Sequence, residues 1–194
     1  MQITIAASFQ HRGGAAHRGF TLIELVVVLV ILGVLSLIAL PRVASSINAR
    51  RARTAAELLR ADLQSARTTA MTTSRPLLIG FDTSASTYTV SEALGAPPAG
   101  MDPIEREVDL SAEPYGVRIA SASFRAFGLV EPPRERFVYD MYGRARSPEA
   151  SLFESPGTAD LPVYEGEVRL EAGPRWVRVV LDPATGSVSV GTLR

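Results

Sequence analysis

The hydrophobic residues begin with one long apolar run. Residues 20–40 (FTLIELVVVLVILGVLSLIAL) contain a single charge, Glu24. At about 1.5 Å per residue, a helix of this length spans roughly 30 Å, the thickness of the hydrocarbon core of a bilayer. We therefore predict a membrane-spanning helix over residues 20–41. A buried core helix is the alternative, and the absence of a polar face disfavours it.

An amphipathic segment follows over residues 42–75, in which Ala, Leu, Arg and Glu favour helix. Its apolar positions fall close to one helical stripe, formed by Val43, Ile47, Ala55, Leu58, Leu59, Leu63, Ala66 and Ala70. We predict one long helix from Phe20 to Thr73, kinked near Pro41 and ended by Pro76.

Short alternating runs typical of strands make up residues 76–194. We expect strands at 76–82, 87–91, 106–110, 116–127, 137–140, 166–171, 175–182 and 187–192. Long loops are expected at 92–103 and 143–162, where Pro, Gly and Ala are frequent. In the closing meander, Val177, Val179 and Leu181 share one face, and this face can pack on the helix stripe. The predicted fold is α+β, with the long N-terminal helix packed on an antiparallel β-sheet head.

The composition excludes several kinds of chemistry. The chain has no cysteine and no lysine, and both histidines, His11 and His17, precede residue 20. Disulfides, thiolate metal sites, cysteine nucleophiles and lysine Schiff bases are therefore excluded. The sequence contains no calcium-loop pattern and no phosphate-binding glycine loop. We predict no enzymatic activity, no metal and no cofactor.

The charges are distributed unevenly although the net charge is zero. Arg12 and Arg18 precede the apolar run without an acidic residue, which favours a cytoplasmic N-terminus and a translocated head. Residues 76–194 hold eleven arginines and seventeen acidic residues, a net charge of −6. Four arginines follow the span, at positions 42, 50, 51 and 53. They either touch lipid headgroups or bind DNA phosphates, and the lack of interleaved aromatic residues favours lipid.

Residues 18–25 (RGFTLIEL) resemble the processing signal of type IV prepilins and type II secretion pseudopilins. In that family a prepilin peptidase cleaves after the glycine and N-methylates the new first residue. The resemblance thus implies cleavage between Gly19 and Phe20, N-methylation of Phe20 and loss of residues 1–19 as a leader peptide. Pro41 also lies where many members of the family have a proline.

Glu24 matches the family's glutamate and lies four residues after Phe20. A carboxylate within a membrane span is costly unless a cation meets it. The amine of Phe20, in the same chain or in a neighbouring subunit, can supply that cation after cleavage. Alternatively, Glu24 lies near the membrane interface, where its carboxylate can reach water without a cation from another chain. The resemblance implies that Glu24 acts in assembly.

The head carries a narrower resemblance, to H-type minor pseudopilins and FimT-type pilins. It rests on residues 55–82, on FVYDMYGR at 137–144 and on VRVVLDPATGSV at 177–188. It implies a minor pseudopilin of a type II secretion system, held in the bacterial inner membrane with its head in the periplasm. Its expected partners are the prepilin peptidase, other major and minor pseudopilins, an inner-membrane assembly platform and membrane lipid.

The alternative hypothesis is a FimT-like minor pilin of a type IV pilus system, which binds DNA for uptake. Its candidate contacts are Arg144 and Arg146, within a Gly-Arg-Ala-Arg sequence. However, the head is acidic, and the closing turn at residues 186–189 (GSVS) has no arginine. Because neutralisation of phosphate charge drives DNA binding, a nucleic-acid partner is not expected.

Overall fold

The chain forms two compact units, Met1–Pro41 and Arg42–Arg194. The computed structural model describes residues 20–93, 100, 102–126, 134–148 and 162–194, and for residues 37–41 it describes the backbone alone. The predicted leader at residues 1–19 lies outside the described residues, as does most of both predicted loops.

Helix α1 (Leu22–Thr73) confirms the predicted long helix and is 52 residues long. Its backbone is helical through Pro41, and the predicted kink at that residue stays a prediction. The large apolar side chains described in the first unit are exposed, with exposed fractions between 45% at Val28 and 83% at Leu22. Among the described residues, no helix combines the length and hydropathy of a membrane span.

The second unit contains two antiparallel sheets. The five-stranded sheet has the order β3-β2-β1-β5-β6, formed by β1 (Leu77–Asp82), β2 (Thr87–Glu92), β3 (Glu105–Asp109), β5 (Arg136–Tyr139) and β6 (Ala145–Arg146). The four-stranded sheet has the order β4-β7-β8-β9, formed by β4 (Arg118–Ala126), β7 (Val163–Ala172), β8 (Arg175–Leu181) and β9 (Val188–Val190). The predicted hairpin is confirmed, because β1 and β2 pair across a four-residue turn.

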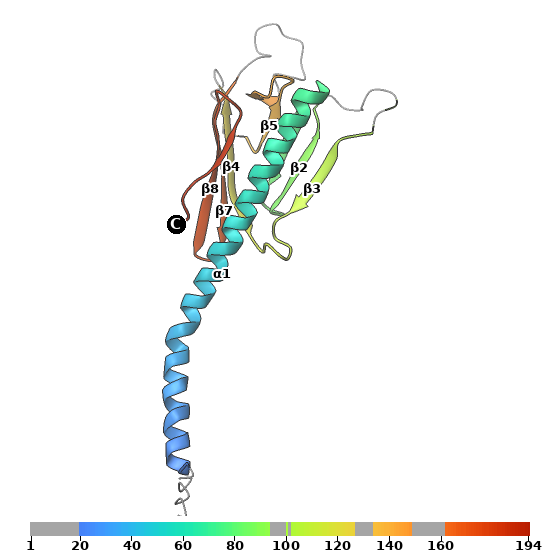
Figure 1. Cartoon of the computed structure of the whole chain (residues 1–194). Coiled ribbons are helices and arrows are strands. Elements are labelled where there is room, and N and C mark those ends of the chain that lie inside the picture. Colours follow the sequence, from blue (N-terminus) through green and yellow to red (C-terminus); the bar gives the residue numbers. More distant parts are fainter. Residues whose placement is uncertain (1–19, 94–99, 101, 127–133, 149–161) are drawn as a thin grey trace, which may run out of the picture. The chain divides into compact units, whose positions relative to one another are not determined.

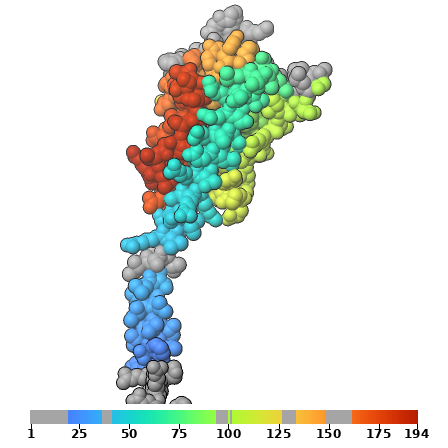
Figure 2. Space-filling view, viewed as in Figure 1, coloured from blue at the N-terminus to red at the C-terminus, as the bar shows by residue number. Residues whose placement is uncertain are grey.

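Within the second unit, helix α1 lies across both sheets, with β7 and β8 on one side and β2 and β3 on the other (Figure 1). The space-filling view shows the same segment of helix between the yellow-green and the red strands (Figure 2). The buried apolar residues of the helix are Ala52, Ala55, Ala56, Leu59, Leu63, Ala66 and Ala70. Most of these residues are alanines, so the sheets can approach the helix closely.

Two residues of the predicted stripe do not belong to this buried face. Val43 is 57% exposed and Ile47 is 47% exposed. At about 100° per residue, Val43 lies roughly 160° and Ile47 roughly 120° around the helix from Leu59. Their side chains therefore point away from the core, and the sequence prediction was wrong for these two positions.

A row of aromatic rings joins the two sheets into one core. Phe124 of β4 lies between Phe81 of β1 and Phe137 of β5, with ring centroids 5.5 and 4.6 Å away. Tyr88 and Tyr139 extend the row at its two ends. Such tilted and stacked pairs stabilise a core beyond the burial of their area.

Two strand predictions need correction. Strand β6 lies within residues 143–162, which were predicted to be a loop, and it pairs with Val138 and Tyr139 of β5. Strand β7 begins at Val163, three residues earlier than predicted, because Val163 pairs with Ala126 of β4. Both differences arise from partners distant in sequence, which local turn signals do not reveal.

Candidate functional site

The N-terminal end of α1 contains the predicted processing and assembly residues. Phe20 is 78% exposed and lies before the helix, whereas Gly19 is outside the described residues. The Thr21 hydroxyl oxygen accepts a hydrogen bond from the Glu24 N–H at 3.3 Å, so Thr21 is the N-cap of the helix. Phe20 therefore remains outside the first helical turn.

The structure thus brings Glu24 together with Thr21, a residue that the sequence prediction missed. The spacing Thr-x-x-Glu is that of a capping box, and this signal was available in the sequence. Glu24 is the acidic residue of the first turn, where the partial positive charge of the helix terminus favours a carboxylate. Glu24 therefore has a local role in starting the helix, beside any role in assembly.

The second candidate site is the Gly-Arg-Ala-Arg turn between β5 and β6, which Asp140 organises. One carboxylate oxygen of Asp140 accepts hydrogen bonds from the N–H groups of Tyr142 at 2.9 Å and Arg144 at 2.8 Å. The other accepts Nε–H of Arg144 at 2.9 Å and Nε–H of Arg146 at 3.1 Å. The two predicted arginines are therefore held by one carboxylate, whose role the sequence prediction missed.

The electrostatics of this turn favour the ionised carboxylate. Burial acts to raise the pKa of Asp140, but the hydrogen bonds from the Arg144 N–H and from the guanidinium groups of Arg146 and Arg144 hold it below its usual value. Arg146 is only 7% exposed. The Arg144 guanidinium lies 4.9 Å from the centre of the Tyr142 ring, a cation–π contact. Contact of these arginines with nucleic acid remains part of the alternative hypothesis.

A buried polar network connects α1 to the five-stranded sheet. The Tyr88 hydroxyl donates a hydrogen bond to Oδ2 of Asp62 at 2.5 Å, and Nη1 of Arg106 lies 2.9 Å from Oδ1. Burial, and then the bond to Asp62, raise the pKa of Tyr88 far above its ordinary value. The phenol therefore stays protonated as a donor, so this network holds the helix on the sheet.

Residues 14–40 match the family described as the prokaryotic N-terminal methylation motif. No curated protein sequence matches the chain. Among solved structures, the chain is similar to the minor pseudopilin EpsH from the type 2 secretion system of Vibrio cholerae. The identity is 12%, the match covers 73% of this chain and 97% of that chain, and the TM-score is 0.44. It is also similar to the type IV minor pilin FimU of Pseudomonas aeruginosa (strain PAO1), with 17% identity, coverage of 74% and 90%, and a TM-score of 0.41.

The matched segment contains Gly19, Phe20 and Glu24, which carry the resemblance found in the sequence, and it includes the capped start of α1. The motif implies processing by a prepilin peptidase and assembly with other pilins or pseudopilins. The helix that begins in this segment continues into the second unit and packs there on antiparallel sheets. The similarity to the N-terminal methylation motif family thus lies in residues 14–40, at the start of the long helix.

Proposed function

We propose that this protein is a minor pseudopilin of a type II secretion system, a structural subunit of the periplasmic pseudopilus that helps to export folded proteins. The observation that carries the proposal is the methylation motif at residues 14–40. In this proposal residues 20–41 anchor the chain in the inner membrane, with the N-terminus cytoplasmic and the head in the periplasm. The subunit then joins other pseudopilins at the inner-membrane assembly platform.

Processing follows from the start of the helix. The Thr21 cap leaves Phe20 outside the helix and largely exposed, which keeps the residue after the cleavage site accessible to the peptidase. Cleavage after Gly19 converts the amide nitrogen of Phe20 into an amine, and N-methylation preserves its positive charge. The motif therefore produces a cation four residues before Glu24.

Assembly uses that cation. An unpaired carboxylate in hydrocarbon costs on the order of 2.5–3.5 kcal/mol on insertion scales. We expect Glu24 to meet the amine of Phe20 in a neighbouring subunit, because this contact removes the cost and sets the axial register. The exposed apolar side chains around Glu24 would then be covered by lipid and by other subunits.

The proposal is tested by intact-mass analysis of protein extracted from the membranes of a host that has a prepilin peptidase. The expected product begins at N-methyl-Phe20 and has 175 residues, the 194 of the chain less the 19 of the leader. Gly19→Val should block cleavage by steric exclusion. Gly13→Val makes the same change before the matched segment and should not block cleavage. Retention of Met1 in the wild-type protein would contradict the proposal.

The competing function is that of a FimT-like pilin that binds DNA. Two observations weigh against it, since Arg146 is buried and both candidate arginines donate to Asp140. A gel-shift assay separates the two functions: DNA binding that weakens in Arg144→Ala and with rising salt favours uptake. The neighbouring genes also separate the two functions. Genes of a secretion system beside this one would support the pseudopilin, whereas competence or pilus genes would support DNA uptake.

A further inference from the structure

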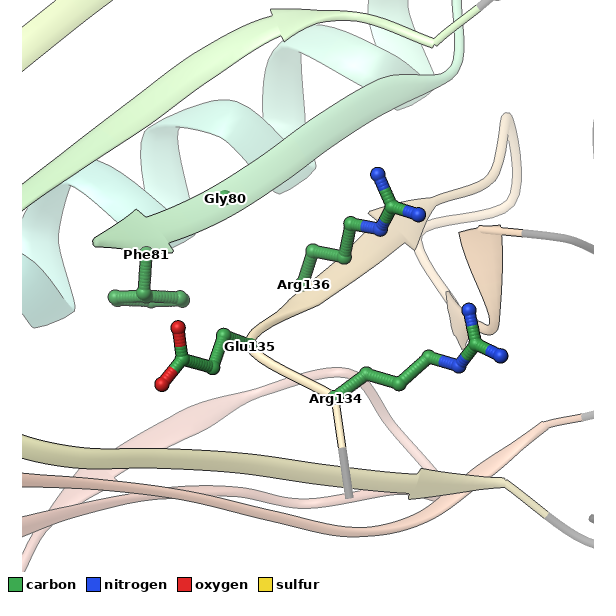
Figure 3. A pocket seen from close by; sticks show the side chains of 5 residues that line it. All are labelled: Gly80, Phe81, Arg134, Glu135 and Arg136. Carbon is green, nitrogen blue, oxygen red and sulfur yellow. The ribbon is translucent and has the colours of Figure 1, made fainter. Parts of the chain in front are cut away.

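A pair of arginines lines an open pocket beside strand β1. Arg134 and Arg136 lead into β5, and opposite them lie Gly80 and Phe81 of β1. Figure 3 shows the side chains that line the pocket. Its volume is about 430 Å³. Neither the methylation motif nor the Gly-Arg-Ala-Arg turn includes any of these residues.

The backbone around the pocket is held on both sides. Arg134 exchanges two backbone hydrogen bonds with Phe124 of β4, at 2.9 and 3.0 Å. The Phe81 N–H donates to the carbonyl of Glu135 at 2.9 Å, and Arg136 pairs with Gly80 in the ladder. The segment therefore links the two sheets, and its side chains project from a fixed main chain.

Alternation along this extended segment separates the charges. Arg134 and Arg136 extend in the same direction, whereas Glu135 points the other way, toward Phe81 (Figure 3). The Glu135 carboxylate accepts a hydrogen bond from the Thr83 hydroxyl at 2.9 Å. The two arginine side chains thus lie on one side of the segment, with Cα atoms about 6.5 Å apart in extended backbone, and the intervening carboxylate points away from them.

Arg136 differs from most arginines of the sheets. Within the part of the chain that the structure describes, it makes no ion pair. Six of the others pair with carboxylates: Arg106 with Asp62, Arg118 and Arg169 with Glu171, Arg125 with Glu165, Arg178 with Glu167, and Arg146 with Asp140. In a head of net charge −6, Arg136 retains its donors for a ligand.

We propose that this arginine pocket binds a carboxylate from an acidic peptide segment of a partner protein. The planar guanidinium fork of Arg136 matches a carboxylate with two parallel hydrogen bonds. The net negative charge of the head disfavours a long polyanion such as nucleic acid, because phosphate contacts must overcome repulsion over the whole footprint. A short acidic segment needs only the local positive charge.

The test is fluorescence anisotropy with a fluorescein-labelled hexaglutamate peptide and the full chain in a neutral detergent. Arg136→Gln should weaken binding at least about tenfold, since a charge-assisted bidentate contact is lost. Arg125→Gln is the matched control: it removes the same charge from an exposed arginine that already pairs with Glu165, and should weaken binding less than about twofold. Arg136→Lys keeps the charge without the fork and should give an intermediate loss.

Three outcomes would overturn the proposal. The first is that the wild-type protein does not bind hexaglutamate. The second is an equal loss in Arg136→Gln and Arg125→Gln, which would indicate net charge alone. The third is tighter binding of a single-stranded hexanucleotide than of the peptide, with the same dependence on Arg136. Arg136 is exposed, so its variants should keep the melting temperature of the wild-type protein, which a thermal scan checks.

Discussion

Gly186, in the turn between β8 and β9, lies directly against Gly143, in the turn between β5 and β6. A Cβ atom on Gly186 would be 2.2 Å from the carbonyl oxygen of Gly143. That carbonyl accepts a hydrogen bond from Nε–H of Arg67 on α1 at 2.9 Å, and the carbonyl of Gly186 accepts one from the Tyr139 hydroxyl at 3.0 Å. One turn from each sheet thus meets the helix at a single place and holds both sheets against it.

Gly186→Ala should therefore destabilise the head strongly. Gly186 has a φ of 69°, and a side chain in that conformation costs roughly 1–2 kcal/mol before any clash. The new methyl group must also displace the backbone of Gly143. The matched control is Gly100→Ala, because Gly100 has a φ of 88° and no atom of the residues that the structure describes lies within 4 Å of the added Cβ. Urea unfolding should show a clearly larger loss for Gly186→Ala, and equal losses would mean that the two turns do not depend on each other.

Two buried tyrosines should make the head sensitive to alkaline pH. Burial raises the pKa of Tyr88 and of Tyr139 above the ordinary value of 10.0, although the charge of Arg67 opposes this at Tyr139. The unfolded chain then loses these protons first. The stabilisation is complete below about pH 10 and falls as the pH rises, by up to about 1.4 kcal/mol per pH unit for each tyrosine.

Urea unfolding between pH 8 and pH 11 measures this effect. Tyr88→Phe should lower stability at pH 8 by about 1–3 kcal/mol, since it leaves Oδ2 of buried Asp62 without its donor. The same substitution should also make the free energy of unfolding fall less steeply with pH above pH 10. Tyr142→Phe is the control, because Tyr142 is 66% exposed and should change neither quantity. A wild-type stability that stays constant up to pH 11 would contradict the assignment.

Asp140 should make the head sensitive to acid. Its pKa lies below the usual value, so the stabilisation that it provides is complete above about pH 4 and is lost as the pH falls through the lowered pKa. Asp140→Asn should remove that part of the acid dependence and leave Arg144 and Arg146 without their carboxylate. Asp102→Asn, at an exposed aspartate, is the control. Identical acid midpoints in wild type and Asp140→Asn would argue against this role.

Glu24→Leu should impair assembly without affecting the head. The substitution removes the only charge of the apolar run, so membrane insertion should be at least as efficient. Cleavage after Gly19 should continue. In the proposed pseudopilus, crosslinking to partner subunits should fall, because the amine of the neighbouring subunit loses its carboxylate. The head forms a unit separate from residue 24, so its melting temperature should not change. An undiminished crosslinking yield would refute the pairing, and a lowered melting temperature would show that Glu24 supports the head.

The elements that local pattern specifies were predicted well. The apolar run and the helix-forming residues after it predict α1 to its last residue, Thr73, because side-chain spacing and propensity act within a few residues. The hairpin of β1 and β2 was predictable for the same reason, since turn residues separate two alternating runs. The Thr21 cap also has a sequence signal, a Thr-x-x-Glu spacing that is readable without any partner from elsewhere in the chain.

Features that depend on distant partners were not predictable. The residues that the structure describes contain nine strands, which divide into two sheets. This division depends on pairings between distant residues, such as Gly80 with Arg136. Arg146 is buried because Asp140 lies beside it after the chain turns, although its residue type is typical of the surface. In the sequence Gly186 is one turn glycine among others, and its contact with Gly143 is visible only in the folded chain. Periodicity describes which face of an element is apolar, whereas the contact between two faces is a property of the packed chain.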